Sequence, residues 1–349
     1  MITRKVDRND SLAGFIYNWV KKLSTQVDRL TVITWQEGDA SGLPSNVEVI
    51  QLSTKQNKLL KVVKLKMAVW RNIKKVDGVF CHQMPLYTII AAPIAKLYGK
   101  KVVSWYTHKQ VDFKMKLMTR LANVVLTASK ESFRLPSKKV IAVGHGIDTE
   151  MFKSSESKKS SDTFRIISVG RISPTKDLES IIKAVNLLST ESSESIELEI
   201  VGQVGLKEHQ TYSEVLYQMA ENYNAENLEC NIIFTLGLAP SGIPKKLQDA
   251  DLFINMSGTG SLDKAVLEAM ACGCLVLTSN EAFEKMLPVE LKTQRDNPQM
   301  LAEKIKQIMV LSDERKQQLR SQLRQEVVVN HNLDNLVKTI ASQFNGKTS

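Results

Sequence analysis

Short runs of apolar and β-branched residues recur along the chain and alternate with segments whose apolar residues recur every three or four positions. The first pattern predicts buried strands and the second predicts amphipathic helices. In the first half of the chain we expect strands at residues 30–35, 47–52, 78–82, 101–106, 124–128 and 139–143. In the second half we expect them at residues 165–169, 196–201, 231–236, 252–255 and 275–278. Strands separated by helices predict an α/β fold, with parallel sheets covered by helices on both faces.

A polar segment divides this pattern in two. Residues 154–162 read SSESKKSSD and contain no apolar residue, which is typical of a linker. The length of the chain fits two domains, which we expect at residues 1–153 and 162–310. The helical region at residues 311–349 is expected to pack back toward the first domain. Two doubly wound, Rossmann-like domains would face each other across a cleft, with ligands at the carboxyl ends of their strands.

The segment at residues 256–280, MSGTGSLDKAVLEAMACGCLVLTSN, carries the strongest functional signal. A polar loop at residues 257–263 runs into a predicted helix that ends at Gly273, and Glu268 lies one turn inside that helix. Backbone N–H groups at a helix start attract anions, and a carboxylate can accept two hydrogen bonds from a sugar diol. The pattern thus indicates a site for an anion that carries hydroxyl groups. The alternative is an ordinary strand–helix connection in which Asp263 caps the helix.

A second signal lies in ISVGRISPTKDLESIIKAVNLL, at residues 167–188. A predicted strand ends at Gly170, and a loop with Arg171 and Lys176 follows before an amphipathic helix. Both cations should therefore lie beyond the carboxyl end of the strand, where they suit a diphosphate. The alternative is a loop with two solvated cations. The sequence contains neither the P-loop motif nor the glycine fingerprint of dinucleotide-binding domains.

Together with GIDTEMF at residues 146–152, these two segments resemble the family 4 retaining glycosyltransferases, which have the GT-B fold. The other matching motifs are VGR with its following lysine, and LEAMACG at residues 267–273. The resemblance runs in order over nearly the whole chain. It implies transfer of a sugar from a nucleotide-diphosphate donor with retained anomeric configuration. It also implies that no metal and no other cofactor is required.

The resemblance implies roles for residues of the second domain. Arg171 and Lys176 match the cations that hold the diphosphate and help it depart, and Glu268 matches the glutamate that holds the donor ribose. Leu238 would lie beside the base. Backbone amides of the loop would contact phosphate and sugar at Ser261, Leu262, Asp263 and Lys264.

Two residues of the first domain match family positions near the donor. His108, in WYTHKQVDF, follows a predicted strand and matches a histidine near the donor sugar; the alternative is a structural histidine. Gly14, in DSLAGF, matches a glycine that lets the backbone approach the diphosphate. The alternative there is a plain glycine at a helix start.

The chain departs from the family pattern in two places. The family commonly has a glutamate eight positions before the one that matches Glu268, and here that position is Gly260. Asp263 or Lys264 would then replace it as the partner of the donor sugar's hydroxyl groups. The chain also begins MITRKVDRND, where residues 1–3 resemble only the end of the expected central strand. We expect the natural start to lie upstream, rather than a truncated domain with unpaired strand edges.

Positive charge is concentrated in the first domain. The formal net charge is +10, and residues 1–150 hold 25 Lys and Arg against 11 Asp and Glu. Residues 55–75 hold eight cations and no acid. Their apolar stripe at helical spacing consists of Leu59, Leu60, Val63, Met67 and Trp70. We expect the stripe to pack on its own domain while the cations face an anionic membrane surface; the alternative is a solvated helix. No motif favours nucleic acid as a partner.

The remaining composition sets the expected location and class. The chain has no run of about 18 apolar residues and no leader-like segment. The cysteines are expected to be reduced packing residues, at Cys81, Cys230, Cys272 and Cys274. We therefore expect a cytoplasmic enzyme, peripheral on the inner face of the membrane, that glycosylates an envelope glycan or a lipid-linked acceptor. The alternatives are a sugar-nucleotide epimerase of the same fold, and a catalytically silent homologue that binds nucleotide sugar or membrane.

Overall fold

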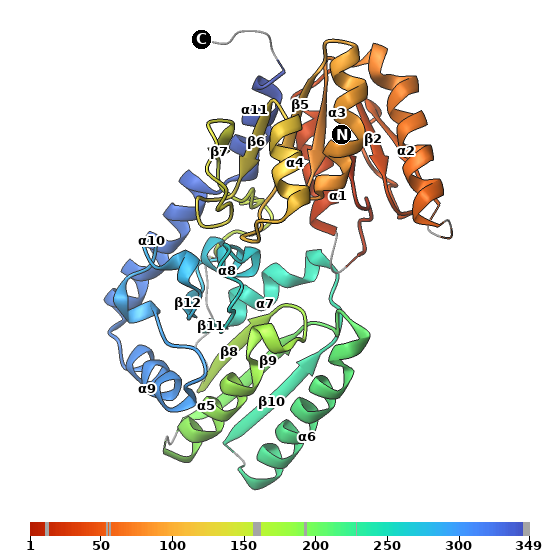
Figure 1. Cartoon of the computed structure of the whole chain (residues 1–349). Helices are drawn as coiled ribbons and strands as arrows, with labels where there is room; N and C mark the ends of the chain where they lie inside the picture. The colour runs from red at the N-terminus through yellow and green to blue at the C-terminus, as the bar shows by residue number, and fades with distance from the viewer. Residues whose placement is uncertain are drawn as a thin grey trace. The chain divides into compact units, whose positions relative to one another are not determined.

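The computed structural model describes residues 1–10, 14–53, 55, 57–155, 162–191, 194–227 and 229–344 (Figure 1). The chain forms two compact units. Unit 1 comprises Met1–Asp148 and Asn330–Ser349, and unit 2 comprises Thr149–Val329. The predicted α/β class is confirmed, because each unit is built on a parallel sheet with connecting helices.

Unit 1 holds a seven-stranded parallel sheet in the order β3-β2-β1-β4-β5-β6-β7. Its strands are β1 (Ile2–Thr3), β2 (Leu30–Thr34), β3 (Val47–Gln51), β4 (Gly78–His82), β5 (Lys101–Trp105), β6 (Val124–Thr127) and β7 (Val140–Ala142). All strands expected in this half are present. Both residues of β1 are buried between β2 and β4, where Ile2 pairs with Ile33 and with Cys81.

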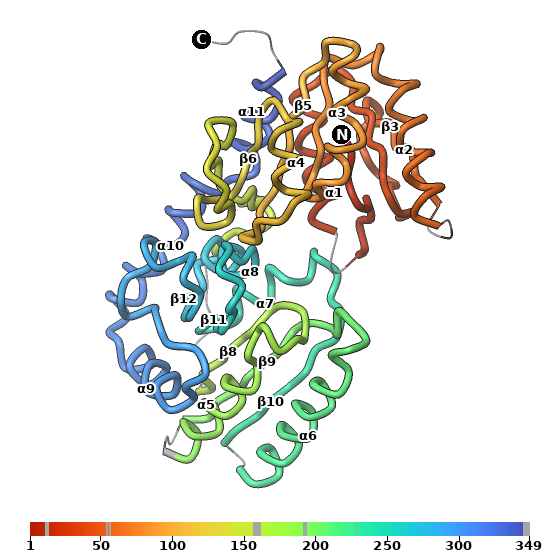
Figure 2. The backbone as a smooth tube through the Cα atoms, viewed as in Figure 1, coloured from red at the N-terminus to blue at the C-terminus, as the bar shows by residue number. Residues whose placement is uncertain are grey.

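The helices of unit 1 form two layers. They are α1 (Gly14–Ser24), α2 (Lys58–Asn72), α3 (Pro85–Leu97), α4 (Phe113–Leu121) and α11 (Leu333–Ser342), with a 3-10 turn, η1, at Ile73–Lys75. The chain moves along the sheet in one direction through α1 and in the other through α2, α3 and α4. Right-handed crossovers therefore place α1 on one face and the other three on the opposite face. Helix α3 contacts both α2 and α4, and α11 contacts α1 (Figure 2).

Helix α2 packs through a different face from the one predicted. The expected stripe of Leu59, Leu60, Val63, Met67 and Trp70 is between 43 % and 80 % exposed, so the expectation that it packs on the domain is wrong. The buried face instead carries Leu65 and Val69 and continues to Ile73. These three residues are four positions apart and also form an apolar stripe. Because both stripes have helical spacing, only the neighbouring core determines which one is buried.

Unit 2 holds a five-stranded parallel sheet in the order β10-β9-β8-β11-β12. Its strands are β8 (Thr163–Val169), β9 (Ser195–Val201), β10 (Cys230–Thr235), β11 (Leu252–Asn255) and β12 (Leu275–Thr278). Its helices are α5 (Leu178–Glu191), α6 (Gln210–Glu226), α7 (Ile243–Asp249), α8 (Lys264–Ala271), α9 (Pro298–Met309) and α10 (Asp313–Asn330). Short 3-10 turns lie at Pro174–Lys176 (η2), Lys207–His209 (η3), Pro240–Gly242 (η4), Glu281–Phe283 (η5) and Val289–Leu291 (η6).

The units divide the chain differently from the expected domains. Residues 149–153 belong to unit 2 rather than to the first domain, and the helical region 311–349 is shared between the units. Helix α10 belongs to unit 2, whereas α11 belongs to unit 1, where Lys22 forms an ion pair with Asp334 at 2.9 Å. Most of the expected linker, residues 156–161, lies outside the described residues.

Two further features of the structure concern the cysteines and the apolar character of the helices. All four cysteines have free thiols and are buried, as packing residues should be. Among the described residues, no helix is both long enough and apolar enough to cross a bilayer.

Candidate functional site

The site in unit 2 lies at its topological switch point, between β8 and β11. From these adjacent strands the chain proceeds in opposite directions along the sheet. In doubly wound sheets, ligands bind beyond the carboxyl ends of the strands at such a point. The loop with Arg171 and Lys176 follows β8, and residues 257–263 follow β11. The topology therefore brings together the two segments that the sequence analysis singles out.

An ion pair joins these two loops. Lys176 Nζ lies 2.9 Å from Asp263 Oδ1 and 3.5 Å from Ser257 Oγ. The side chains of Lys176 and Asp263 are only 15 % and 16 % exposed. The other carboxylate oxygen, Asp263 Oδ2, accepts a hydrogen bond of 3.4 Å from Asn280 Nδ2. Lys176 is thus held at the carboxyl end of β8 and is not a solvated cation.

Asp263 occupies the N-cap position of α8, but its side chain makes no capping hydrogen bond. Its two oxygens are engaged by Lys176 and Asn280 instead. The interpretation of Asp263 as a helix cap is therefore right about its position and wrong about its side chain. The carboxylate positions a lysine rather than the helix.

Arg171 lines the same small pocket as Lys176, together with Gly170 and Asn255. The arginine is exposed, and its aliphatic stem lies against Gly205, where an added Cβ would be 2.8 Å from Arg171 Cδ. No ion pair with a described residue engages its guanidinium. Its planar fork of N–H donors can therefore bind an anion in this pocket.

Glu268 lies inside α8 and is buried, with 8 % of its surface exposed. Lys264, one turn earlier on the helix, forms an ion pair with Glu268 Oε1. The lysine ammonium also lies 5.5 Å from the centre of the Phe152 ring. A buried carboxylate requires such a partner, and Lys264 supplies it.

The loop after β11 is held by its own polar groups. The carbonyl of Ser261 accepts hydrogen bonds from Asn280 Nδ2 at 2.9 Å and from Thr259 Oγ1 at 3.5 Å. Leu262, within the loop, is buried, and Leu238 is half-buried after β10. These bonds fix the loop, whereas contacts of its amides with phosphate and sugar stay predictions.

Gly260, where the resemblance implies a glutamate, has a backbone conformation that suits glycine. Its φ is +61°, in the left-handed region, and the residue is buried. A glutamate there would carry a Cβ in a backbone conformation that costs about 1 to 2 kcal/mol. Asp263 and Lys264, the expected substitutes, already form ion pairs with Lys176 and Glu268.

Of the two predicted residues of unit 1, one lies in the loop after a strand and the other begins a helix. His108 is exposed after β5, with its ring centre 6.3 Å from that of Tyr106. Gly14 begins α1, is buried, and donates a hydrogen bond from its N–H to Asp10 O at 2.8 Å. Their roles toward a donor stay predictions.

Comparison with known protein families decides the class of this chain. Residues 150–326, just over half of the chain, match the family Glycosyl transferases group 1. The matched segment includes Arg171, Lys176, Asp263 and Glu268. The chain belongs to this family. It is a glycosyltransferase of group 1.

Solved structures resemble the glycosyltransferase over its whole length. HepE from Anabaena, solved with UDP and glucose, has a TM-score of 0.76 and 16 % identity, with 99 % of each chain covered. Sucrose-phosphate synthase from Thermosynechococcus elongatus has a TM-score of 0.77 and 13 % identity, covering 99 % of this chain and 98 % of that one.

The trehalose-6-phosphate synthase OtsA has a TM-score of 0.76 and 10 % identity, with 99 % of each chain covered. These likenesses show the fold, two Rossmann-like units as in GT-B enzymes. No curated protein matches the sequence of the glycosyltransferase.

Sequence reasoning missed two residues that hold the loops of the glycosyltransferase. Asn280 follows β12 at the same edge of the sheet, so its position after a strand was a usable signal. Arg295 Nη2 donates to Pro174 O at 3.1 Å, and its Nε lies 4.0 Å from Asp177 Oδ2. An added Cβ at Gly258 would lie 2.2 Å from Arg295. No local pattern marks Arg295, because its partner Pro174 is 121 residues away.

A buried histidine at the switch point of unit 1 was also missed. His82 ends β4 and is fully buried, with Nδ1 3.0 Å from Thr3 Oγ1 at the end of β1. Its ring centre lies 4.8 Å from that of Trp19, and Trp19 lies 5.1 Å from Trp105. Burial, and to a lesser extent His145, lowers the pKa of His82 to about 3. The imidazole is therefore neutral at physiological pH.

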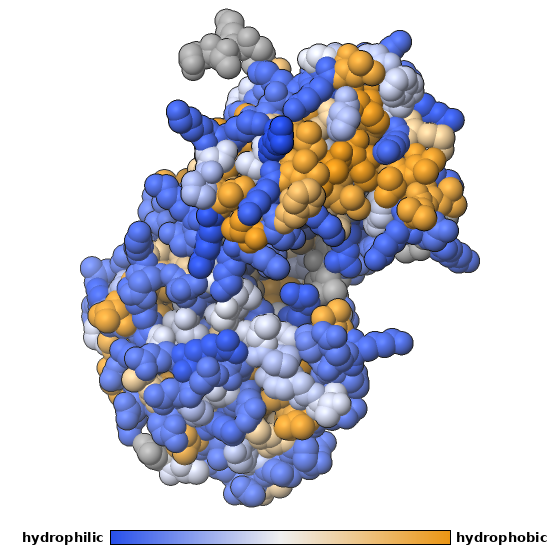
Figure 3. Space-filling model, viewed as in Figure 1, coloured by the Kyte–Doolittle hydropathy of each residue, from blue (hydrophilic) through white to orange (hydrophobic). Residues whose placement is uncertain are grey.

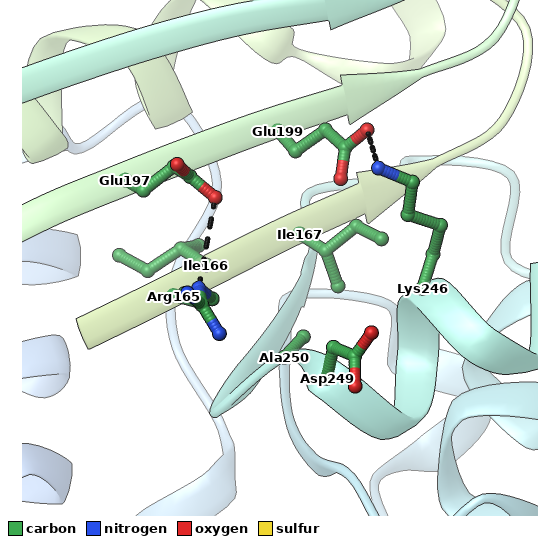
Figure 4. Close-up of a pocket in the computed structure, with 8 residues that line it drawn as sticks. All are labelled: Arg165, Ile166, Ile167, Glu197, Glu199, Lys246, Asp249 and Ala250. Atoms are coloured by element: carbon green, nitrogen blue, oxygen red, sulfur yellow. Dashed lines mark ion pairs between the residues drawn. The ribbon is translucent and has the colours of Figure 1, made fainter. Parts of the chain in front are cut away.

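A further pocket in unit 2 lies over β8 and β9 beside α7 (Figure 4). Four of its five charged residues pair with one another: Lys246 Nζ lies 2.7 Å from Glu199 Oε1, and Arg165 Nε lies 3.9 Å from Glu197 Oε1. Thr235 Oγ1 also donates to Glu199 Oε1 at 2.5 Å. The fifth charged residue of the lining, Asp249, pairs through Oδ1 with Lys245 Nζ at 2.7 Å.

No metal cluster is evident in the part of the chain that the structure describes. No group of three or more His, Cys, Asp or Glu side chains is arranged there to hold a metal ion. The metal independence of the glycosyltransferase stays a prediction.

Proposed function

We propose that this glycosyltransferase moves a sugar from a nucleotide-diphosphate donor to an envelope glycan or a lipid-linked acceptor, with retention of anomeric configuration as in family 4. The observation that carries the proposal is the joined pair of loops at the switch point of unit 2. Arg171 and Lys176 line one pocket there, and Lys176 is paired with Asp263 at the start of α8. Glu268 lies buried within the same helix.

The two cations suit the charge that develops in such a reaction. Negative charge grows on the leaving diphosphate as the sugar–phosphate bond breaks. Arg171 offers a planar fork and Lys176 a point charge, while the positive end of the α8 dipole adds to both. Asp263 already holds Lys176 in place, so little reorganisation is needed when the donor binds.

The donor's ribose is assigned to Glu268. Lys264 pairs with Oε1 of that carboxylate, and Oε2 would accept the ribose hydroxyl groups. HepE has been solved with UDP and with UDP-glucose. Because of that structural neighbour, UDP-sugars are the first donors to test.

Retention requires no nucleophile from the protein in this scheme. The acceptor hydroxyl attacks the anomeric carbon from the side on which the diphosphate leaves. Its oxygen bonds to that carbon, the bond from carbon to phosphate oxygen breaks, and the hydroxyl proton passes to the leaving phosphate. His108 and Gly14 of unit 1 would lie near the donor sugar and its diphosphate. The two cations and the start of α8 neutralise the leaving group without a metal ion, so EDTA should leave the rate unchanged.

The experiment is an assay of transfer and hydrolysis across UDP-, GDP- and ADP-sugars, with nucleotide binding measured on the same protein. We expect turnover with one class of donor and a product of retained configuration by NMR. Arg171→Ala should lower kcat by about 10² to 10³. Arg165→Ala is the matched control, because Arg165 lies on β8 but lines a different pocket, beside α7.

Two results would contradict the proposal and identify the alternatives. Nucleotide binding without turnover of any donor would indicate a catalytically silent homologue. Conversion of the donor sugar to its epimer without an acceptor would indicate an epimerase.

A further inference from the structure

Unit 1 exposes a continuous apolar surface on the helix layer formed by α2, α3 and α4. Figure 3 shows hydrophobic residues gathered over these helices. Each helix contributes a large, strongly exposed side chain: Leu59 of α2 is 80 % exposed, Leu97 of α3 is 70 % exposed, and Phe113 of α4 is 77 % exposed. Large apolar surfaces of this kind mark sites of interaction with a protein or a membrane.

The surface is continuous because the three helices pack side by side. Helix α3 contacts α2 on one side and α4 on the other. Trp70 of α2 packs edge to face on Tyr98, with ring centres 5.6 Å apart, and Tyr98 directly follows Leu97. The exposed stripe of α2 therefore runs onto the end of α3. Pro93 and Met84 extend it along α3.

The charge within these three helices is entirely positive, and the exposed Asp112 lies at the N-cap of α4. None of the three helices contains an Asp or a Glu. Exposed cations lie on or directly beside them at Lys58, Lys66, Arg71, Lys74, Lys96, Lys114, Lys116 and Arg120. None of these cations forms an ion pair with a described residue. Unlike these exposed cations, Lys61 of α2 is buried, and its Nζ donates a hydrogen bond to Trp35 O at 3.3 Å.

The combination of exposed apolar side chains and exposed cations favours one kind of partner. A second copy of the same surface would bring like charges together, and a polyanion such as nucleic acid would leave the apolar side chains in water. The surface of an anionic bilayer matches both, because its headgroups attract the cations while its interior takes up the apolar side chains. The aromatic Trp70 suits the boundary between the two.

We propose that the exposed layer of α2, α3 and α4 docks on an anionic lipid bilayer. The proposal deepens the proposed function, on which its link to a lipid-linked acceptor rests. A protein docked through unit 1 would meet such an acceptor at the membrane surface without crossing the bilayer. Membrane binding is measured without donor or acceptor, so it is independent of whether transfer is observed.

The experiment is sedimentation of the full chain with vesicles of phosphatidylglycerol or of phosphatidylcholine. We expect binding to the first alone, and release at high salt because screening weakens charge attraction. Leu59→Ser, Leu97→Ser and Phe113→Ser combined should weaken binding at least tenfold. Val289→Ser with Val310→Ser is the matched control, because both are strongly exposed on unit 2. Unchanged thermal melting verifies that the variants fold.

The contribution of charge and the depth of insertion are tested on the same vesicles. Each cation near an anionic surface contributes about 1 kcal/mol, or about fivefold in binding. Lys66→Glu with Lys114→Glu should therefore weaken binding more than twentyfold, whereas Lys207→Glu with Lys285→Glu on unit 2 should not.

Brominated lipids should quench the fluorescence of Trp70, and Trp70→Phe should abolish that quenching. The proposal is overturned if the apolar variant binds like its control. It is equally overturned if the protein binds no vesicle and instead forms a dimer that this variant abolishes.

Discussion

Replacing Lys176 by Met gives the sharpest test of the diphosphate site, because the structure predicts two separable effects. The first is on stability. At 2.9 Å the ion pair with Asp263 has a gross attraction of about 6 kcal/mol at an effective dielectric constant of about 20. Desolvation of both charges offsets most of this. Removing Lys176 leaves a mostly buried carboxylate with Asn280 as its remaining partner, and we expect unfolding free energy to fall by about 2 to 3 kcal/mol.

The second effect is on the rate. Without its cation the leaving diphosphate loses stabilisation in the transition state, so kcat should fall by about 10² to 10³. The double variant Lys176→Met with Asp263→Asn removes the unpaired carboxylate. It should recover most of the lost stability and none of the lost rate, because the donor still lacks its cation.

Urea unfolding and initial rates at saturating donor measure the two effects on the same preparations. Lys183→Met is the matched control, since Lys183 pairs with Glu179 at 2.6 Å on the exposed side of α5 in the same unit. That pair should change stability by less than about 1 kcal/mol and leave kcat unaltered. If the double variant recovers activity along with stability, Lys176 only supports the loops and the diphosphate assignment is wrong.

Three further predictions follow from other parts of the structure. Glu268→Gln should raise the donor KM about tenfold with little change in kcat, and a 2′-deoxyribose donor should remove the difference; an equal penalty with both donors would refute the ribose role. Gly260→Ala should lower the unfolding free energy by about 1 kcal/mol, because the residue has a left-handed φ, and should also raise the donor KM. Gly99→Ala is the control: Gly99 has a φ of +65° on an open surface, so this variant should change stability alone. His82 has its pKa lowered to about 3 from about 6.5, so the unfolded state protonates first and unfolding free energy should fall by up to about 5 kcal/mol as pH drops from 6.5 to 3. His82→Gln should flatten that dependence, and a histidine NMR titration with a pKa above 5 would contradict it.

Much of the fold could be predicted from local pattern. Each expected strand is present because runs of apolar and β-branched residues such as Leu275–Thr278 are too short for a helix and too apolar for a surface. The functional segments were also local, since Arg171 and Lys176 directly follow one strand and residues 257–263 follow another. The class was predictable for the same reason, because the family match includes these motifs.

What the sequence alone determined was therefore which segments form strands and helices, and which loops carry the candidate chemistry. Pairing across the chain was decided only by the tertiary structure. In the alternative interpretation Asp263 caps its own helix, yet its carboxylate binds Lys176, 87 residues away. Helix α2 was expected to bury one apolar stripe and buries the other, Leu65 and Val69, because the sheet beside it fits that face. Local spacing records which side chains share a face, but the energy of burial or of an ion pair depends on the neighbour that the fold supplies.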